Sequence, residues 1–217
     1  DEEAYGRGTS VYLVDRVIPM LPTVLSNGIC SLNAGEDRYS MTCTMEIDAN
    51  GNVIKSDIGP AIIRVKRRCN YREINQALLE HVVPRDLEPF MPMVQELKAL
   101  ATILKDMRLR RGAIDFDFPE YKILLDADGK PLRLEKRERS IAEQIVEECM
   151  LIANETVATY LKDSKNPSVY RVHETPEPER LEMMNTVLSS FNLPMPNTDD
   201  VKPLDFQKLI DVSKGTE

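Results

Sequence analysis

Apolar residues recur every three or four positions in two long stretches of the chain, which is the spacing of an amphipathic helix. The first stretch covers residues 86–110 and ends just before Gly112, a residue that suits a helix C-cap. The second covers residues 140–163, with Ser140 at the N-cap and Glu143 at the capping-box spacing. Shorter helical patterns occupy residues 71–82, 177–191 and 204–212.

Runs of β-branched and other apolar residues predict strands between and around these helices. These runs lie at residues 11–18, 40–48, 53–58, 61–65 and 169–172. Asn50-Gly51 and Asp128-Gly129 predict hairpin turns. Antiparallel β-hairpins beside long helices predict an α+β fold, in which hairpins or sheets pack with several long α-helices.

The helix predicted over residues 140–163 is apolar around most of its circumference, so we expect it to be buried. Glu147 and Glu148 lie in the middle of it. A buried carboxylate needs a partner or a raised pKa. One of the two is therefore expected to point into a polar site, and a structural ion pair with an arginine is the equal alternative.

Composition limits the function only in part. The chain has 217 residues, of which 42% are hydrophobic and 29% charged, and its net charge is −8. No long apolar run or secretory leader is present, which predicts a cytoplasmic protein without a membrane span. The acidic net charge argues mildly against nucleic acid. However, basic residues form clusters at 64–68, 108–111 and 136–139, as a solvated surface or as a basic inner face.

The chain shows no catalytic constellation that is complete in itself. It has no phosphate-binding loop, no nucleophile elbow and no aspartate pair in a plausible site. The turn around Asn50-Gly51 resembles a calcium loop only superficially, because the glycine comes too early and no closing glutamate follows. The four cysteines form no C-x-x-C pair, which predicts buried free thiols.

Five segments nevertheless carry a specific and ordered set of motifs. They are RGTSVYLVDRVIPMLP from Arg7, LSNGICSLN from Leu25, RGAIDF from Arg111, IVEECMLIAN from Ile145 and YRVHETP from Tyr170. In these segments the chain closely resembles the catalytic (RNB) domain of the RNase II/RNase R family of exoribonucleases. The finer match favours RNase R over RNase II.

The resemblance implies that residues 1–217 are an internal, partial RNB domain. In the family, an acidic motif with the metal-binding aspartates precedes the Arg7–Pro22 segment, and a Thr-Ser-Pro-Ile-Arg-Arg-Tyr motif follows later; the chain contains neither. The implied activity of the parent is processive 3′→5′ hydrolysis of single-stranded RNA to nucleoside monophosphates with Mg²⁺. We expect the chain itself to be inactive, to form a wall of the RNA channel, and to hold no catalytic residue or metal ligand.

The resemblance also implies four RNA-binding residues. Tyr12 matches a tyrosine that packs on the 3′-terminal nucleotide, and Phe116 matches an aromatic residue at the other end of the buried bases. Such stacking tolerates any base. Tyr71 and Glu147 match a tyrosine and a glutamate that recognise ribose, and both groups suit a 2′-hydroxyl. For the three aromatic residues, an ordinary place in the core is the alternative.

Two other functions are compatible with parts of this pattern. A non-catalytic RNA-binding or scaffold relative would have lost the aspartates of the acidic motif. An unrelated α+β interaction domain would require the five ordered motifs to be accidental. A partial domain also exposes apolar surface, so self-association of the chain is a further hypothesis.

Overall fold

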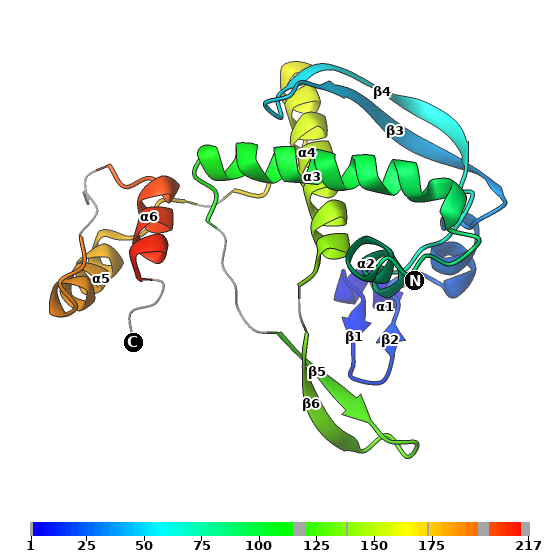
Figure 1. Cartoon of the computed structure of the whole chain (residues 1–217), viewed down its shortest axis with the longest axis horizontal. Helices are drawn as coiled ribbons and strands as arrows, with labels where there is room; N and C mark the ends of the chain where they lie inside the picture. Colours follow the sequence, from blue (N-terminus) through cyan, green and yellow to red (C-terminus); the bar gives the residue numbers. More distant parts are fainter. Residues whose placement is uncertain (1, 115–119, 138, 173, 195–199, 214–217) are drawn as a thin grey trace. The chain divides into compact units, whose positions relative to one another are not determined.

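The computed structural model describes residues 2–114, 120–137, 139–172, 174–194 and 200–213. The chain forms two compact units, each built from three segments. Unit 1 contains Asp1–Thr44, Ser56–Met93 and Phe118–Gln144, and unit 2 contains Met45–Lys55, Val94–Asp117 and Ile145–Glu217. Helices combine with two-stranded antiparallel sheets (Figure 1), which confirms the predicted α+β class.

Unit 1 begins with a short helix and a small hairpin. Helix α1 (Glu2–Arg7) is followed by β1 (Val11–Tyr12) and β2 (Val17–Ile18), in which Tyr12 pairs with Val17. A turn closes this hairpin where the Leu13 amide donates to the Arg16 carbonyl at 2.8 Å. The single strand predicted over residues 11–18 is therefore wrong, because four of its residues form the turn.

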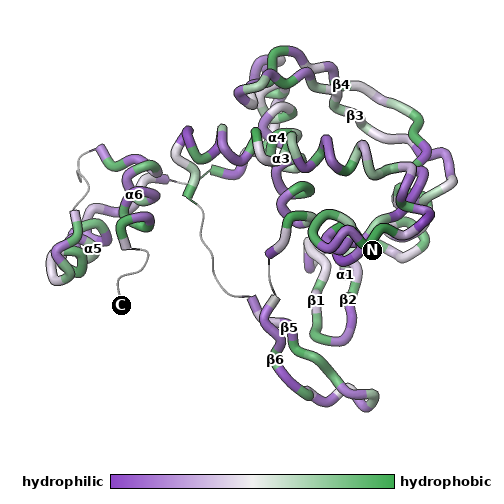
Figure 2. Tube along the Cα trace, in the orientation of Figure 1, coloured by the Kyte–Doolittle hydropathy of each residue, from purple (hydrophilic) through white to green (hydrophobic). Residues whose placement is uncertain are grey.

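The rest of unit 1 contains short helices and a second hairpin. Its helical segments are η1 (Val24–Ile29), α2 (Tyr71–Asn75), η2 (Gln76–Glu80) and η3 (Glu88–Phe90). The hairpin joins β5 (Glu120–Leu125) to β6 (Pro131–Arg137), and the Asp126 carboxylate accepts from two amides of the turn, as predicted for this segment. Figure 2 shows hydrophobic and hydrophilic residues mixed along both strands.

The longest hairpin consists of β3 (Asp37–Ile47) and β4 (Val53–Arg64), which confirms the strands predicted on both sides of Asn50-Gly51. Asp48 Oδ1 accepts hydrogen bonds from the amides of Asn50 and Asn52 at 2.9 and 2.8 Å. The tip of this hairpin belongs to unit 2. There the Arg110 side chain of α3 (Met91–Arg110) donates to the Asn50 carbonyl at 2.8 Å.

Unit 2 is built around α3 and α4 (Ile141–Asp163), with α5 (Pro178–Ser190) and α6 (Pro203–Ser213) completing it. Its buried apolar residues come from three helices: Val94, Ala101 and Leu104 of α3, Ile145 and Ile152 of α4, and Leu181 of α5. Gly112 ends α3 with φ +99°, as expected for a C-cap, and its backbone lies against Leu204. The two long helices are thus confirmed within a residue or a few of their predicted bounds.

Two other expectations are wrong. Residues 169–172 form no strand, and Val169 and Val172 are exposed, because the segment has no neighbouring strand with which to pair. All four cysteines are free as predicted, but Cys30 and Cys69 are exposed and Cys43 and Cys149 are only partly buried. None of the described helices is both long and apolar enough to cross a bilayer.

Candidate functional site

Tyr71 stands at the edge of an open pocket within unit 1. It is the first residue of α2, which begins with a capping box: the Asn70 side chain accepts from the Glu73 amide, and the Glu73 carboxylate accepts from the Asn70 amide. Tyr71 is 43% exposed. A core position, the alternative for this tyrosine, is therefore wrong.

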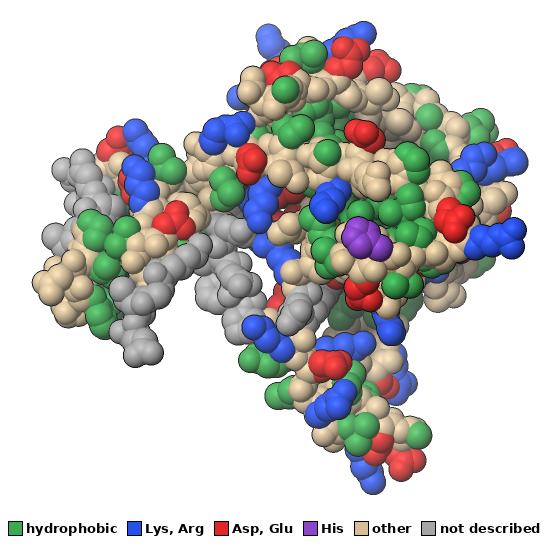
Figure 3. All heavy atoms as spheres, in the orientation of Figure 1, with side chains coloured by type: hydrophobic (Ala, Val, Ile, Leu, Met, Phe, Trp, Pro, Cys, Tyr) green, Lys and Arg blue, Asp and Glu red, His purple; other side chains and the backbone are tan. Residues whose placement is uncertain are grey.

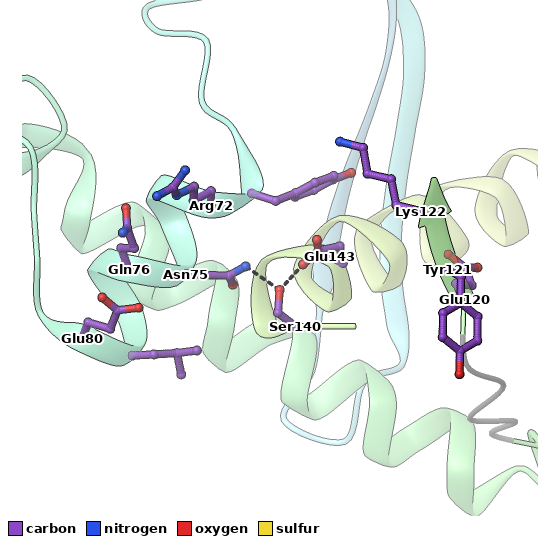
Figure 4. A pocket seen from close by; sticks show the side chains of 11 residues that line it. Arg72, Asn75, Gln76, Glu80, Glu120, Tyr121, Lys122, Ser140 and Glu143 are labelled. Carbon is purple, nitrogen blue, oxygen red and sulfur yellow. Dashed lines mark hydrogen bonds between the residues drawn. The ribbon is translucent and has the colours of Figure 1, made fainter. Parts of the chain in front are cut away.

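The pocket has a volume of about 960 Å³ and three walls (Figure 4). They consist of Tyr71, Arg72, Asn75, Gln76, Leu79 and Glu80 from α2 and η2, Glu120, Tyr121 and Lys122 from β5, and Ser140 and Glu143 at the start of α4. The lining combines cations, carboxylates, amides and aromatic rings. Such a set can contact a ligand that offers anionic groups, hydroxyls and flat rings.

A side-chain network connects two of these walls. Asn75 donates to the Ser140 hydroxyl, and its Oδ1 accepts from the Ala142 amide at 3.0 Å; the Ser140 hydroxyl donates in turn to the Glu143 carboxylate (Figure 4). Ser140 precedes the first residue of α4, as predicted for its N-cap. An amide of the first turn is capped by Asn75, from a segment far away in the sequence, while the Ser140 hydroxyl bonds to the Glu143 carboxylate.

Tyr12 lies in β1, and its side chain is 78% exposed. A place in the core, the alternative for this tyrosine, is therefore wrong as well. It belongs to the same unit as Tyr71 but does not line the pocket. Phe116, the third predicted aromatic contact, lies outside the described residues.

Glu147 and Glu148 occupy different environments on α4 of unit 2. Glu148 is 2% exposed and accepts two hydrogen bonds from Arg108 of α3, at 2.6 and 3.2 Å. The Glu147 side chain is 34% exposed and lies 3.7 Å from Nη2 of the same arginine. Glu148 is therefore the structural ion-pair partner, and Glu147 is the carboxylate that remains accessible.

A second ion pair joins the residue just after α3 to α4. Arg111 donates to both carboxylate oxygens of Glu155 at 2.6 and 2.8 Å, with both side chains about half exposed. These hydrogen bonds hold the pKa of Glu155 below its ordinary value, and Arg108 contributes to the same shift. Burial, and then the neighbouring Glu148, raise the pKa of the Cys149 thiol.

The basic clusters have different structural roles. The 108–111 cluster is engaged in structural contacts, and in the 64–68 cluster Arg67 holds Glu73 and Asp86 while Arg64 holds Asp37. Lys and Arg side chains, interspersed with acidic ones, are exposed along the β5–β6 hairpin (Figure 3). For the 64–68 and 108–111 clusters, the structure therefore does not support a basic inner face.

The part of the chain that the structure describes contains no carboxylate cluster for a metal ion. Across the described ranges, no three or more His, Cys, Asp and Glu side chains are arranged to hold one. Two of the glutamates on α4, Glu148 and Glu155, are paired with Arg108 and Arg111. The described residues therefore do not fit a bound Mg²⁺.

Two residues with structural importance were not singled out by the sequence. Asn75 had no local signal, because its partners lie 65 and 67 positions away. Arg108 was visible only as a member of a basic cluster, and its choice of Glu148 depends on how α3 crosses α4.

Comparisons with known proteins agree with the motifs. The chain matches the RNB domain over residues 1–216. Ribonuclease R of Thermotoga maritima is 42% identical over 215 residues, which cover 99% of this chain and 30% of that protein. Ribonuclease R of Escherichia coli is 34% identical over 212 residues, or 97% of this chain and 26% of that protein. The chain thus spans less than a third of the length of these two relatives.

A solved structure gives the same result for the fold. Mycoplasma genitalium RNase R in complex with ribose-methylated single-stranded RNA matches with a TM-score of 0.92 and 30% identity, over 99% of this chain and 34% of that protein. The fold, the five motifs and the match over nearly the full length agree, and the chain belongs to the RNB-domain family.

Proposed function

We propose that this chain forms part of the RNA-channel wall of a 3′→5′ exoribonuclease of the RNase R type. In this proposal the parent protein degrades single-stranded RNA processively to nucleoside monophosphates. Tyr12 and Phe116 stack on bases, while Tyr71 and Glu147 contact ribose. The cytoplasm is the location that the resemblance implies.

The observation that carries the proposal is the exposure of Tyr12, a residue of the RGTSVY motif, in a chain that belongs to the RNB family. Burial of a tyrosine ring stabilises a fold, so a ring left 78% exposed on a short hairpin has surface available for a ligand. Stacking on a base is worth about 1–3 kcal/mol and is independent of sequence. An enzyme that degrades any RNA requires this tolerance.

Tyr71 and Glu147 support the same function from separate units. Tyr71 and Arg72 line a pocket that also contains Lys122, so hydroxyl and phosphate contacts are available there. Glu147 is accessible on α4, and a carboxylate accepts the hydrogen bond that a 2′-hydroxyl donates. A deoxyribose lacks this hydroxyl donor, so in this proposal the Glu147 contact favours RNA over DNA.

In this proposal, Mg²⁺ is held in the parent by the acidic motif of the family, and residues 1–217 are a partial domain without that motif. The two-metal chemistry that clamps attacking and leaving oxygens would be supplied there. No step of hydrolysis is assigned to residues of this chain. We therefore expect the chain alone to bind RNA without degrading it.

The test uses a 5′-labelled single-stranded RNA and a DNA of the same sequence. The chain is mixed with each, in Mg²⁺ and in EDTA, and both binding and strand length are measured. We expect RNA to bind more tightly than DNA and to keep its length in both conditions. The protein that carries the chain together with the acidic motif should shorten the RNA from its 3′ end only in Mg²⁺.

Three outcomes would contradict parts of the proposal. Equal affinity for RNA and DNA, or no binding, would reject the ribose-contacting wall. Shortening by the chain itself that survives removal of contaminating nucleases would show that metal ligands lie within it. A parent that binds RNA but never shortens it would support the scaffold alternative instead.

A further inference from the structure

Arg108 lies between two neighbouring carboxylates of α4 and touches both. Its Nη2 is 2.6 Å from Oε1 of Glu148 and 3.7 Å from Oε1 of Glu147. The side chains of Arg108, Glu148 and Glu147 are 14%, 2% and 34% exposed. One carboxylate therefore anchors the guanidinium inside unit 2, while the other is about one third exposed.

We infer that Arg108 is a positioning residue, which acts through Glu147 to make the chain prefer ribose over deoxyribose. The inference rests on the proposed function, in which Glu147 accepts a hydrogen bond from a 2′-hydroxyl. Arg108 does not contact the RNA in this scheme. It fixes the carboxylate that does, and Glu148 in turn fixes Arg108.

The physical basis is the freedom of a glutamate side chain. A glutamate on a helix surface samples several rotamers, and ordering it when the ligand binds costs conformational entropy. A guanidinium fixed by two hydrogen bonds presents an immobile positive charge, which favours the rotamers that keep Glu147 beside it. Preorganised in this way, Glu147 binds a hydroxyl at a smaller entropic cost.

The chain supplies its own control for this role. Arg111, the residue just after α3, joins Glu155 of α4 through two hydrogen bonds, three residues beyond Arg108 and seven residues beyond Glu148. The geometry of the Arg111–Glu155 pair does not depend on Glu147. If the pairs serve only to hold this part of unit 2 together, the loss of either pair should change RNA and DNA binding in the same way. The position of Glu147 depends on Arg108 alone.

The test replaces each pair by two methionines. Arg108→Ala alone would leave Glu148 buried without a partner and can unfold the chain, whereas an apolar pair of similar length leaves no buried charge. The variants Arg108→Met with Glu148→Met, and Arg111→Met with Glu155→Met, are first checked for folding by circular dichroism. Their affinities for labelled RNA and for DNA of the same sequence are then measured by fluorescence anisotropy in EDTA.

The measured quantity is the ratio of the dissociation constants for DNA and RNA. We expect this ratio to fall about two- to tenfold in the Arg108–Glu148 variant, the cost of ordering one glutamate side chain on binding, and to stay unchanged in the control. A merely structural role would weaken RNA and DNA binding by the same factor. An unchanged ratio in the Arg108–Glu148 variant, or an equal fall in the control, overturns the inference.

Two further variants separate this inference from the proposed function. Glu147→Gln should by itself lower the preference for RNA; if it does not, the ribose contact of Glu147 fails, and the proposed function with it. If Glu147→Gln lowers the ratio but the Arg108 variant does not, only the positioning role fails. Arg108→Lys keeps a cation but lacks the fork of donors, so a smaller fall in the ratio is expected, and no fall contradicts the inference.

Discussion

Arg108 and Glu148 form a two-pronged ion pair in which the glutamate is 2% exposed, although both residues lie on helices that also reach the surface. The pair contrasts with Arg111, the residue just after α3, and Glu155 of α4, which remain about half exposed. The two pairs have similar distances and different surroundings. Their energetic contributions should therefore differ strongly.

Removing one partner of the buried pair should be far more damaging than removing one partner of the exposed pair. We expect Arg108→Ala to lower the free energy of unfolding by about 3–5 kcal/mol, because an unpaired carboxylate is left in the interior. Arg111→Ala should cost about 0–1 kcal/mol, because water solvates Glu155 when the arginine is lost. Urea unfolding of the two variants measures both values, and similar losses would contradict the assigned burial.

Glu155 predicts part of the pH dependence of stability. Arg111 holds the pKa of Glu155 below the ordinary value of 4.5. A carboxyl with a depressed folded-state pKa stabilises the fold above its unfolded pKa, and this contribution is lost as pH falls through the folded pKa. We therefore expect wild type to lose its advantage over Glu155→Gln as the pH falls below about 4.5, measured as the difference in urea midpoint. A difference that is constant from pH 7 to pH 3 would contradict this.

Two hairpin glycines allow strain and steric clash to be separated. Gly51 and Gly129 follow an aspartate by three positions and have φ +89° and +80°. A Cβ at Gly51 would lie 2.8 Å from Cβ of Met107, whereas one at Gly129 would meet nothing within 4 Å. We expect Gly129→Ala to cost about 1–2 kcal/mol from the left-handed backbone alone, and Gly51→Ala to cost about 1–3 kcal/mol more from overpacking. Equal losses of stability in thermal unfolding of the two variants would contradict the close contact between Gly51 and α3.

Tyr12 should matter for RNA but not for folding. Because its ring is 78% exposed, Tyr12→Ala should leave the unfolding midpoint nearly unchanged and weaken RNA binding by about 1–3 kcal/mol. Tyr39→Ala is the matched control, since Tyr39 is an 87% exposed strand residue of the same unit outside the motif. Equal losses of affinity for the two variants would argue against a specific role of Tyr12.

The isolated chain should self-associate. Large apolar side chains are extensively exposed, including Tyr5 at 93% and Val169 at 101%. Such surface favours association when no other part of a protein covers it. Light scattering over a wide concentration range should show a mass that rises with concentration, and a constant monomer mass would contradict the expectation.

Local signals in the sequence were sufficient for much of the secondary structure. The two long helices follow from apolar residues at helical spacing, and Gly112 ends the first of them because only glycine adopts φ +99° readily. The hairpin turns at Gly51 and Gly129 follow from the aspartate and glycine chemistry of their own few residues. Residues 169–172 show the limit, because β-branched residues form a strand only when another strand is beside them.

The sequence by itself determined the family and the residues to be tested, because the motifs are strings of neighbouring residues. It placed Glu147 and Glu148 on one helix but could not separate their roles. The expectation that this helix is buried is wrong for part of its surface, because Val146 and Met150 are 49% and 54% exposed. That separation, and the capping of α4 by Asn75, arise only in the tertiary structure. Adjacent residues on a helix point in directions about 100° apart, so their environments depend on which neighbouring element packs against each direction. Here α3 brings Arg108 to Glu148, buries that pair, and leaves Glu147 accessible.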